Sequence, residues 1–191
     1  MPNLLKQIPE TMRKQGISEK IIAGFNVGEK GSSEEVMGLI NQMDKQLTKE
    51  QCLAIMQEQG CCKTGNPAAP HRAFGIEHAD KTLAEKVELL NKANMPHKAP
   101  CHLNNDGTLS VYWGTEHSGK RSCPCGFIKK LPDSFEVPKT FCGCCGGHIR
   151  GNYQKSLGVK LRLKEIVSSS SSSGGKKRCE FLYEVEGNSA K

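Results

Sequence analysis

The sequence predicts an α+β protein in which a helical N-terminal half packs on a C-terminal antiparallel sheet. Before about residue 98, apolar residues recur at helical spacing behind N-cap residues. After residue 158, two segments alternate apolar and polar residues, as strands do. Between these parts lies a cysteine-rich segment with the composition of a metal site. We therefore expect a single domain over residues 1–191, with a helical part at about 1–98 and a cysteine-rich α+β part at about 99–187.

Two predicted helices follow each other between residues 32 and 60. The first, "SSEEVMGLINQMDKQL", has a serine N-cap at 32 or 33 and acidic residues in its first turn. The second, "TKEQCLAIMQEQG", begins with a capping box of Thr48 and Gln51, and Gly60 is placed for a left-handed C-cap. This helix would end just before two adjacent cysteines, Cys61 and Cys62.

A third helix is predicted after a connection. The segment "KTGNPAAPHRAFG" is rich in glycine and proline, so we expect it to be a loop. Thr82 and Glu85 then form another capping box ahead of "LAEKVELLNKAN", and Pro96 would close that helix.

The C-terminal half changes to strand patterns. A short β-rich run is expected at Leu109–Trp113, and a short helix after residue 146 that ends at Gly158. The segments "VKLRLKEIV" and "RCEFLYEV" both alternate, so they predict a β-hairpin. The six-serine run between them predicts a mobile hairpin loop rather than an interdomain linker, because too few residues follow it to fold alone.

The cellular setting affects how the ten cysteines are interpreted. The N-terminus, "MPNLLKQIPETMRKQG", lacks the pattern of a signal peptide, and no apolar run approaches bilayer length, so we expect a cytoplasmic protein without a membrane partner. In a reducing compartment, cysteines are metal ligands, redox groups or buried side chains more often than disulfides.

The positive charge is concentrated in the half that carries most of the cysteines. The formal net charge is +7, and residues 101–191 hold 14 Lys and Arg against 8 Asp and Glu. A basic half can bind nucleic acid, but the chain has one Trp and three Tyr to stack on bases, so a nucleic-acid partner is the less favoured interpretation.

Two cysteine clusters lie sixteen residues apart, in "SCPCGFIKKLPDSFEVPKTFCGCCGGH". Pro124 keeps Cys123 out of the helical region, which favours a chelating loop around Cys123 and Cys125. Glycines around the second cluster predict a winding loop there too. Two pairs of thiolates on separate loops are typical of a structural zinc site, and an iron–sulfur cluster is the alternative. The predicted metal ligands are Cys123, Cys125, Cys142 and Cys144, with Cys145 as a substitute and Cys61 or Cys62 as a further contribution.

Nearby cations would stabilise such a centre. Four thiolates on Zn²⁺ leave a formal charge of −2, which lysine and arginine side chains can balance. The candidates in or beside the segment are Lys120, Arg121, Lys129, Lys130, Lys139 and Arg150.

Other chemistry stays open for these cysteines. They could form disulfides, act in redox reactions, or simply pack, as we expect for Cys52 on its helix. A nucleophilic cysteine, Cys101 or Cys145, would need a base, and a catalytic zinc would need an open coordination position. The histidines available for either role are His102, His117 and His148.

Several short motifs carry a resemblance to a known group. After the second cysteine cluster, the C-terminal part of the chain carries a Gly-Gly turn, a Cys, one residue and a Phe, here Gly174, Gly175, Cys179 and Phe181. The segment "IMQEQGCC" lies upstream. Over about residues 48–62 and 120–186 it resembles uncharacterised bacterial proteins related to the 4-vinyl reductase-like and L-2-amino-thiazoline-4-carboxylate hydrolase-like families. The resemblance implies a small α+β domain with a pocket for a small ligand and metal-binding cysteines. The pattern falls on Cys61 or Cys62, Cys123, Cys125, Cys142, Cys144 and Cys179, whereas Cys145 stands where the group more often has serine.

Three functional hypotheses follow. The first is a metal-binding protein, with zinc as the metal, that acts as a small-ligand-binding or sensory module. The alternative is a cysteine-dependent hydrolase of a small cyclic amide or thiazoline-type substrate. The third is a nucleic-acid-binding zinc module.

Overall fold

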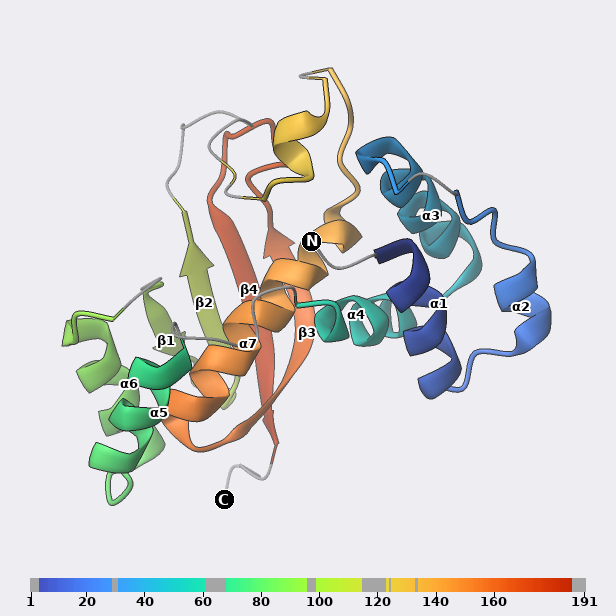
Figure 1. Ribbon diagram of the computed structural model, residues 1–191. Coiled ribbons are helices and arrows are strands. Elements are labelled where there is room, and N and C mark those ends of the chain that lie inside the picture. The colour runs from blue at the N-terminus through green and yellow to red at the C-terminus, as the bar shows by residue number, and fades with distance from the viewer. Residues whose placement is uncertain are drawn as a thin grey trace.

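The computed structural model describes residues 4–28, 31–60, 68–95, 99–114, 123, 125–132 and 134–186 of the chain. Helices fill its N-terminal half, and a four-stranded antiparallel sheet lies in its C-terminal part (Figure 1), which confirms the predicted α+β class.

Within the described residues, six α-helices precede the first strand. They are α1 (Leu4–Lys14), α2 (Glu19–Ala23), α3 (Ser33–Gln46), α4 (Lys49–Glu58), α5 (Ala68–Glu77) and α6 (Leu83–Lys92). None of the helices in this part of the chain is both long and apolar enough to span a membrane.

Three helices begin where the sequence predicts. Ser32, Thr48 and Thr82 are the N-caps of α3, α4 and α6, and each forms a capping box with the residue three positions later. In α4, for example, the Gln51 N–H donates to Thr48 Oγ1 at 3.2 Å, and the Thr48 N–H donates to Gln51 Oε1 at 2.9 Å. These boxes satisfy backbone donors that lack a partner within the helix.

Two local predictions are wrong. The C-cap of α4 is Gln59, at φ −78°, and Gly60 is not left-handed. The Gln59 N–H donates to the Met56 carbonyl and its Nε2 donates to the Ile55 carbonyl at 3.1 Å, so two terminal carbonyls are satisfied without a left-handed residue. The expected loop over 63–75 is helical from Ala68, because Pro70 lies in the first turn, where a missing N–H costs nothing. Pro96 lies outside the described residues.

The sheet has the order β1-β2-β4-β3, and all its neighbours are antiparallel. Its strands are β1 (Cys101–Leu103), β2 (Leu109–Trp113), β3 (Lys160–Ser168) and β4 (Cys179–Glu186). The predicted strand at 109–113 and the predicted hairpin are thus confirmed, the hairpin as β3–β4. Helix α7 (Gly143–Leu157) ends at Gly158 as expected, with φ 70°, and it lies across one face of the sheet (Figure 1).

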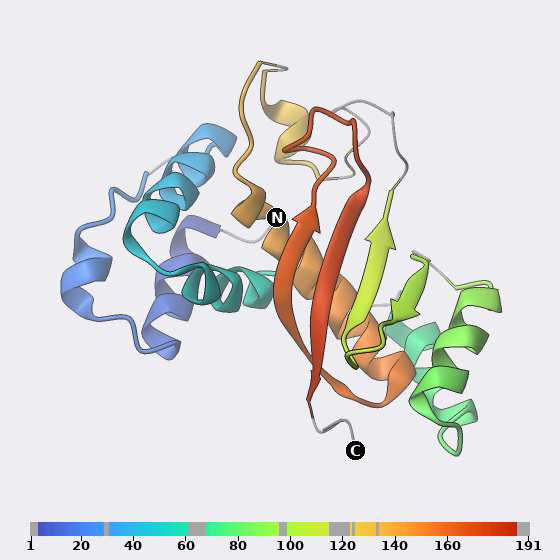
Figure 2. The ribbon, with the colours of Figure 1, turned by 180° about the vertical axis from the view of Figure 1, so that it is seen from behind.

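Burial along β3 shows which face of the sheet is covered. Leu161, Leu163 and Ile166 are buried, whereas Arg162 between them is exposed and pairs with Glu184 of β4. Figure 2 shows the opposite face from behind, and there no helix of the described chain covers the strands. The sheet therefore packs one face on α7 and its neighbouring helices and presents charged side chains on the other side.

Helix α4 joins two buried hydrophobic clusters. Its Ile55 packs in a cluster built from α1, α3 and the segment before α7, whereas its Leu53 packs in a second cluster with α5, α6, α7 and the sheet. A single amphipathic helix thus contributes to the core of both halves.

The cysteine-rich segment lies at one end of the sheet. From Cys123 it passes through two short 3₁₀ helices, η2 (Ile128–Lys130) and η3 (Lys139–Cys142), into the start of α7. Figure 1 shows this segment at the same end as the β3–β4 loop. The segment from Cys123, the start of α7 and the β3–β4 loop therefore lie at the same end of the sheet.

Replacing Gly147 with alanine should destabilise the fold. A Cβ at Gly147 would lie 1.9 Å from the Gln57 carbonyl oxygen of α4, so the two helices would have to separate. We expect Gly147→Ala to lower the free energy of unfolding by about 1–3 kcal/mol, as overpacking does, in urea denaturation.

Gly38→Ala is the matched control. Gly38 also lies inside a helix, α3, but a Cβ there would meet nothing within 4 Å. This change should stabilise the protein by about 0.5–1 kcal/mol, because alanine is the better helix former. Equal effects of the two substitutions would show that the α4–α7 contact does not constrain position 147.

Candidate functional site

The second cysteine cluster is helical and not a glycine loop. Cys142 ends η3 and is the N-cap of α7, with helical φ −67° and ψ −10°, and Cys144 and Cys145 lie in the first turn. The glycines serve close packing: a Cβ at Gly143 would lie 2.7 Å from the Met56 Cβ of α4. The predicted winding loop is therefore wrong, since these glycines permit helix contact rather than unusual backbone angles.

Helical geometry separates the three thiols of this cluster. Successive residues turn by about 100° around a helix axis, so Cys142 and Cys145 lie on one side and Cys144 on another. Cys144 Sγ donates to the Gln59 carbonyl at the end of α4, at 3.3 Å. Of the predicted ligands in this cluster, Cys144 is thus directed toward α4.

Five thiols from three segments gather at the N-terminal end of α7. Burial raises the pKa of the Cys145 thiol well above its ordinary value, and the charges of the other four thiols raise it further. The serine loop joins two of these segments directly, because Ser169 contacts Cys142 and the Ser170 N–H donates to Cys179. We call this group the thiol cluster; it consists of Cys123, Cys125, Cys142, Cys145 and Cys179.

Burial keeps the thiol cluster protonated near neutral pH. It raises the pKa of Cys123 to about 11, partly offset by the Cys125 backbone N–H, and the charges of Cys142 and Cys125 raise it further. Burial also raises the pKa of Cys142 to about 11 and raises that of Cys179. Without a metal, Cys123, Cys142, Cys145 and Cys179 are therefore neutral thiols, which avoid the cost of buried like charges.

Cys179 lies outside the ligand set predicted from cysteine spacing, although the pattern implied by the resemblance includes it. It begins β4 opposite Trp113, and the strand alternation places it on the same buried face as Phe181 and Tyr183. The Ser170 N–H donates to its Sγ at 3.3 Å. The alternation of "RCEFLYEV" was the signal that could have placed this thiol on the inner face.

The serine run packs against the thiols. Ser169, Ser170 and Ser171 are all buried, and Cys142 Sγ lies 2.9 Å from Ser169 Oγ and 3.3 Å from Ser171 Oγ. Composition predicted the hairpin loop correctly, but it did not predict that half of its serines are buried beside cysteines. Hydroxyl groups in these positions lower the pKa of Cys142 against the effect of burial.

Of the cations predicted to surround the site, one acts on a cluster thiol and another forms an ion pair elsewhere. The charge of Lys129 lowers the pKa of Cys123, so this lysine lies where it can stabilise a thiolate. Arg150 instead pairs with Glu58 of α4, with 2.6 Å between Nη2 and Oε1. Lys120 and Arg121 lie outside the described residues.

The cluster is not arranged as a finished metal site. In the part of the chain that the structure describes, no group of three or more His, Cys, Asp or Glu side chains is placed to hold a metal ion as it stands. The chemistry of the donors nevertheless fits a thiophilic ion, because the cluster offers three buried and two half-buried thiols. Cys61 and Cys62 lie outside the described residues.

The remaining candidate nucleophile and bases have other contacts. Cys101 is buried, with a pKa raised by burial to about 12, and its N–H donates to Asn91 Oδ1 at 2.9 Å. His102 is exposed on β1, and His148 Nε2 lies 3.4 Å from Asn152 Nδ2. His117 lies outside the described residues, and Cys52 is buried on α4 as predicted.

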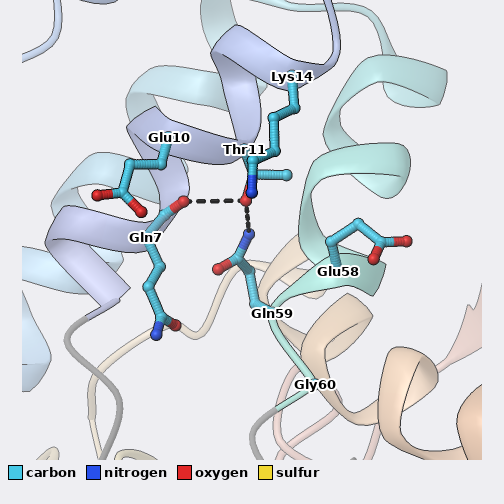
Figure 3. Close-up of a pocket in the computed structure, with 7 residues that line it drawn as sticks. All are labelled: Gln7, Glu10, Thr11, Lys14, Glu58, Gln59 and Gly60. Atoms are coloured by element: carbon cyan, nitrogen blue, oxygen red, sulfur yellow. Dashed lines mark hydrogen bonds between the residues drawn. The ribbon is translucent and has the colours of Figure 1, made fainter.

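A polar pocket of about 400 Å³ lies between α1 and α4 (Figure 3). Gln59 Nε2 donates to Thr11 Oγ1 at 2.8 Å, and Thr11 Oγ1 donates to the Gln7 carbonyl at 2.9 Å. The backbone carbonyl of the same Gln59 accepts the Cys144 thiol. The residues that line this pocket are Gln7, Glu10, Thr11, Lys14, Glu58, Gln59 and Gly60.

Comparison of the chain with protein-family models, curated proteins and solved structures gave no match. The resemblance that its short motifs carry therefore stays a prediction.

Ser169→Ala should destabilise the protein more than Ser172→Ala. Ser169 is buried, and its hydroxyl accepts the Ser172 N–H at 3.2 Å besides contacting Cys142 and Ser171. Its removal leaves buried polar groups without a partner, which costs about 1–3 kcal/mol in urea denaturation. Ser172 is exposed, and its replacement should change the free energy of unfolding by less than about 0.5 kcal/mol. Two equal, small effects would show that the serine run does not stabilise the cluster.

Proposed function

We propose that the thiol cluster binds a thiophilic divalent metal ion, zinc, through Cys123, Cys125, Cys142 and Cys145. Cys179 is a fifth thiol beside these ligands. The observation that carries the proposal is that the buried serines of the β3–β4 loop contact both Cys142 and Cys179. In addition, the charges of the other four thiols act on the pKa of Cys145. Relative to the two pairs that the sequence indicates, Cys145 replaces Cys144, whose thiol is directed to Gln59.

Metal binding resolves the chemical conflict in the cluster. Thiols are ligands only as thiolates, so an ion displaces their protons and supplies the positive charge that makes several buried thiolates tolerable. Lys129 adds a positive charge near Cys123, and Ser169 and Ser171 contribute hydroxyl donors at Cys142. These groups are the surroundings that a thiolate centre needs.

We infer a sensory role rather than a purely structural one. Among the described residues no group of three ligands is placed to hold an ion as it stands, so binding would draw the segment around Cys123 and Cys125 toward the first turn of α7. Occupancy of the site would thus be reported as a change in the order of the segment before α7.

The proposal predicts opposite outcomes for two neighbouring cysteines. Reduced, metal-free protein titrated with Co²⁺ should develop the thiolate-to-cobalt charge-transfer absorption of a tetrahedral site, and Zn²⁺ should abolish it. Cys145→Ser should weaken binding at least tenfold, whereas the matched control Cys144→Ser should bind as the wild type does. Zinc at about 100 times its Kd should raise the free energy of unfolding of the wild type by about 2.7 kcal/mol.

A second variant guards against loss of folding. Cys125 is only half-buried, so Cys125→Ser should keep the circular dichroism spectrum and thermal transition of the metal-free protein while it loses the cobalt bands. Wild-type protein that shows no cobalt–thiolate absorption contradicts the proposal. Equal losses in the Cys144→Ser and Cys145→Ser variants would contradict the ligand set.

A further inference from the structure

The first turn of α7 holds a pair of thiols suited to covalent chemistry. Cys142 and Cys145 have the spacing Cys-X-X-Cys, with Cys142 as the N-cap and Cys145 as the third residue of a helix of 15 residues. Cys-X-X-Cys is the spacing of reactive cysteine pairs. Cys145 is half-buried, so a small disulfide can reach it, and Cys142 is buried three positions before it.

Helix geometry allows these two cysteines to be bridged. Cys142 already has helical φ and ψ, so the two cysteines lie three positions apart along a regular turn. Side chains three positions apart lie on one face, with Cβ atoms about 5–6 Å apart, and a disulfide needs about 3.5–4.5 Å. The adjustment is small and falls where η3 runs into α7.

The other pairings in this turn are disfavoured. Cys142 and Cys144 are about 160° apart around the axis, and Cys144 and Cys145 about 100° apart. Cys144 also donates to the Gln59 carbonyl, which fixes its direction. The sulfur of Cys142 contacts the hydroxyl groups of Ser169 and Ser171, and these can donate to it when it is a thiolate. This contact favours Cys142, rather than Cys144, as a member of the pair.

We propose that Cys142 and Cys145 form a redox-active dithiol, which a low-molecular-weight disulfide oxidises to an intramolecular disulfide, and that this oxidation releases the metal ion. The release of the metal ion rests on the proposed metal site. The thiolate of one cysteine attacks a sulfur of the small disulfide, a mixed disulfide forms, and one small thiolate leaves. The second cysteine then attacks the protein sulfur and expels the other small thiolate.

The atoms and electrons of this exchange balance. The two cysteines lose two electrons and two protons, and the small disulfide gains them as two thiols. A disulfide sulfur is no longer a thiolate ligand, so a centre that uses both cysteines loses two of its four ligands at once. The metal ion then leaves, and reduction by thiols restores the site.

Oxidised glutathione is a suitable probe for the metal-free arm of the test. Trypsin releases residues 140–150, "TFCGCCGGHIR", as one peptide that contains all three cysteines of the turn. After oxidation, alkylation and mass spectrometry, we expect this peptide to carry one alkyl group, on Cys144, and an internal disulfide. Cys144→Ser, the control, should form the same disulfide.

Single substitutions should trap the intermediate. In Cys142→Ser or Cys145→Ser the remaining partner has no second cysteine to resolve the mixed disulfide, so a glutathione adduct should accumulate on this peptide. A bridge that includes Cys144 or a cysteine of another segment overturns the assignment, as does failure of the metal-free wild type to form any disulfide. Unfolding of one single variant leaves the test intact, since the pairing is read from the wild type.

The metal-loaded arm tests the coupling separately. Zinc-loaded protein oxidised by glutathione disulfide should release its zinc in proportion to the disulfide formed, as followed with a chromogenic zinc indicator. Disulfide formation with zinc retained overturns the coupling. Failure of the protein to bind zinc at all counts against the proposed function alone, because the metal-free arm decides the dithiol independently.

Discussion

The backbones of α4 and α7 run so close together that no side chain fits between them, and this contact positions the rest of the site. At Gly147 a Cβ would overlap the Gln57 carbonyl, and at Gly143 it would overlap Met56. The same Gln57 accepts the Leu163 N–H of β3 through its side-chain oxygen at 3.0 Å. One residue of α4 thereby fixes α7 against the sheet. The first turn of α7, with Cys142 and Cys145, is held at the sheet end where the β3–β4 loop also lies (Figure 1).

The location of the thiols follows from that arrangement and has an energetic consequence. Thiols buried at the junction of a helix, a strand and a loop are stable as neutral groups, because a buried thiolate without a counter-charge is expensive. The fold tolerates the cluster only while it is protonated, covalently paired or metal-bound. The two proposals concern the covalently paired and the metal-bound states of the same thiols, and both follow from the burial of these thiols.

Local signals in the sequence predicted the helix starts and the hairpin well, because Ser32, Thr48, Thr82 and the alternating strands act through neighbours in the chain. The site was harder to predict. Glycine either permits unusual backbone angles or permits close approach, and only the position of α4 shows that Gly147 does the second. The direction of Cys144 likewise required knowing that its turn is helical. The buried serines gave no local signal, since a serine run has the composition of an exposed loop.

In the two proposals, the spacing of Cys142 and Cys145 makes metal binding and disulfide formation mutually exclusive. A helical turn places both sulfurs on one side, where they can share an ion or bond to each other, but each sulfur has one valence for either purpose. A loop could have separated these functions by moving one cysteine away, whereas a helix fixed by close packing on α4 cannot. The glycines that bring α7 onto α4 therefore also keep the two thiols in competition. Cys144 lies between them in sequence and is excluded from that competition by its direction alone.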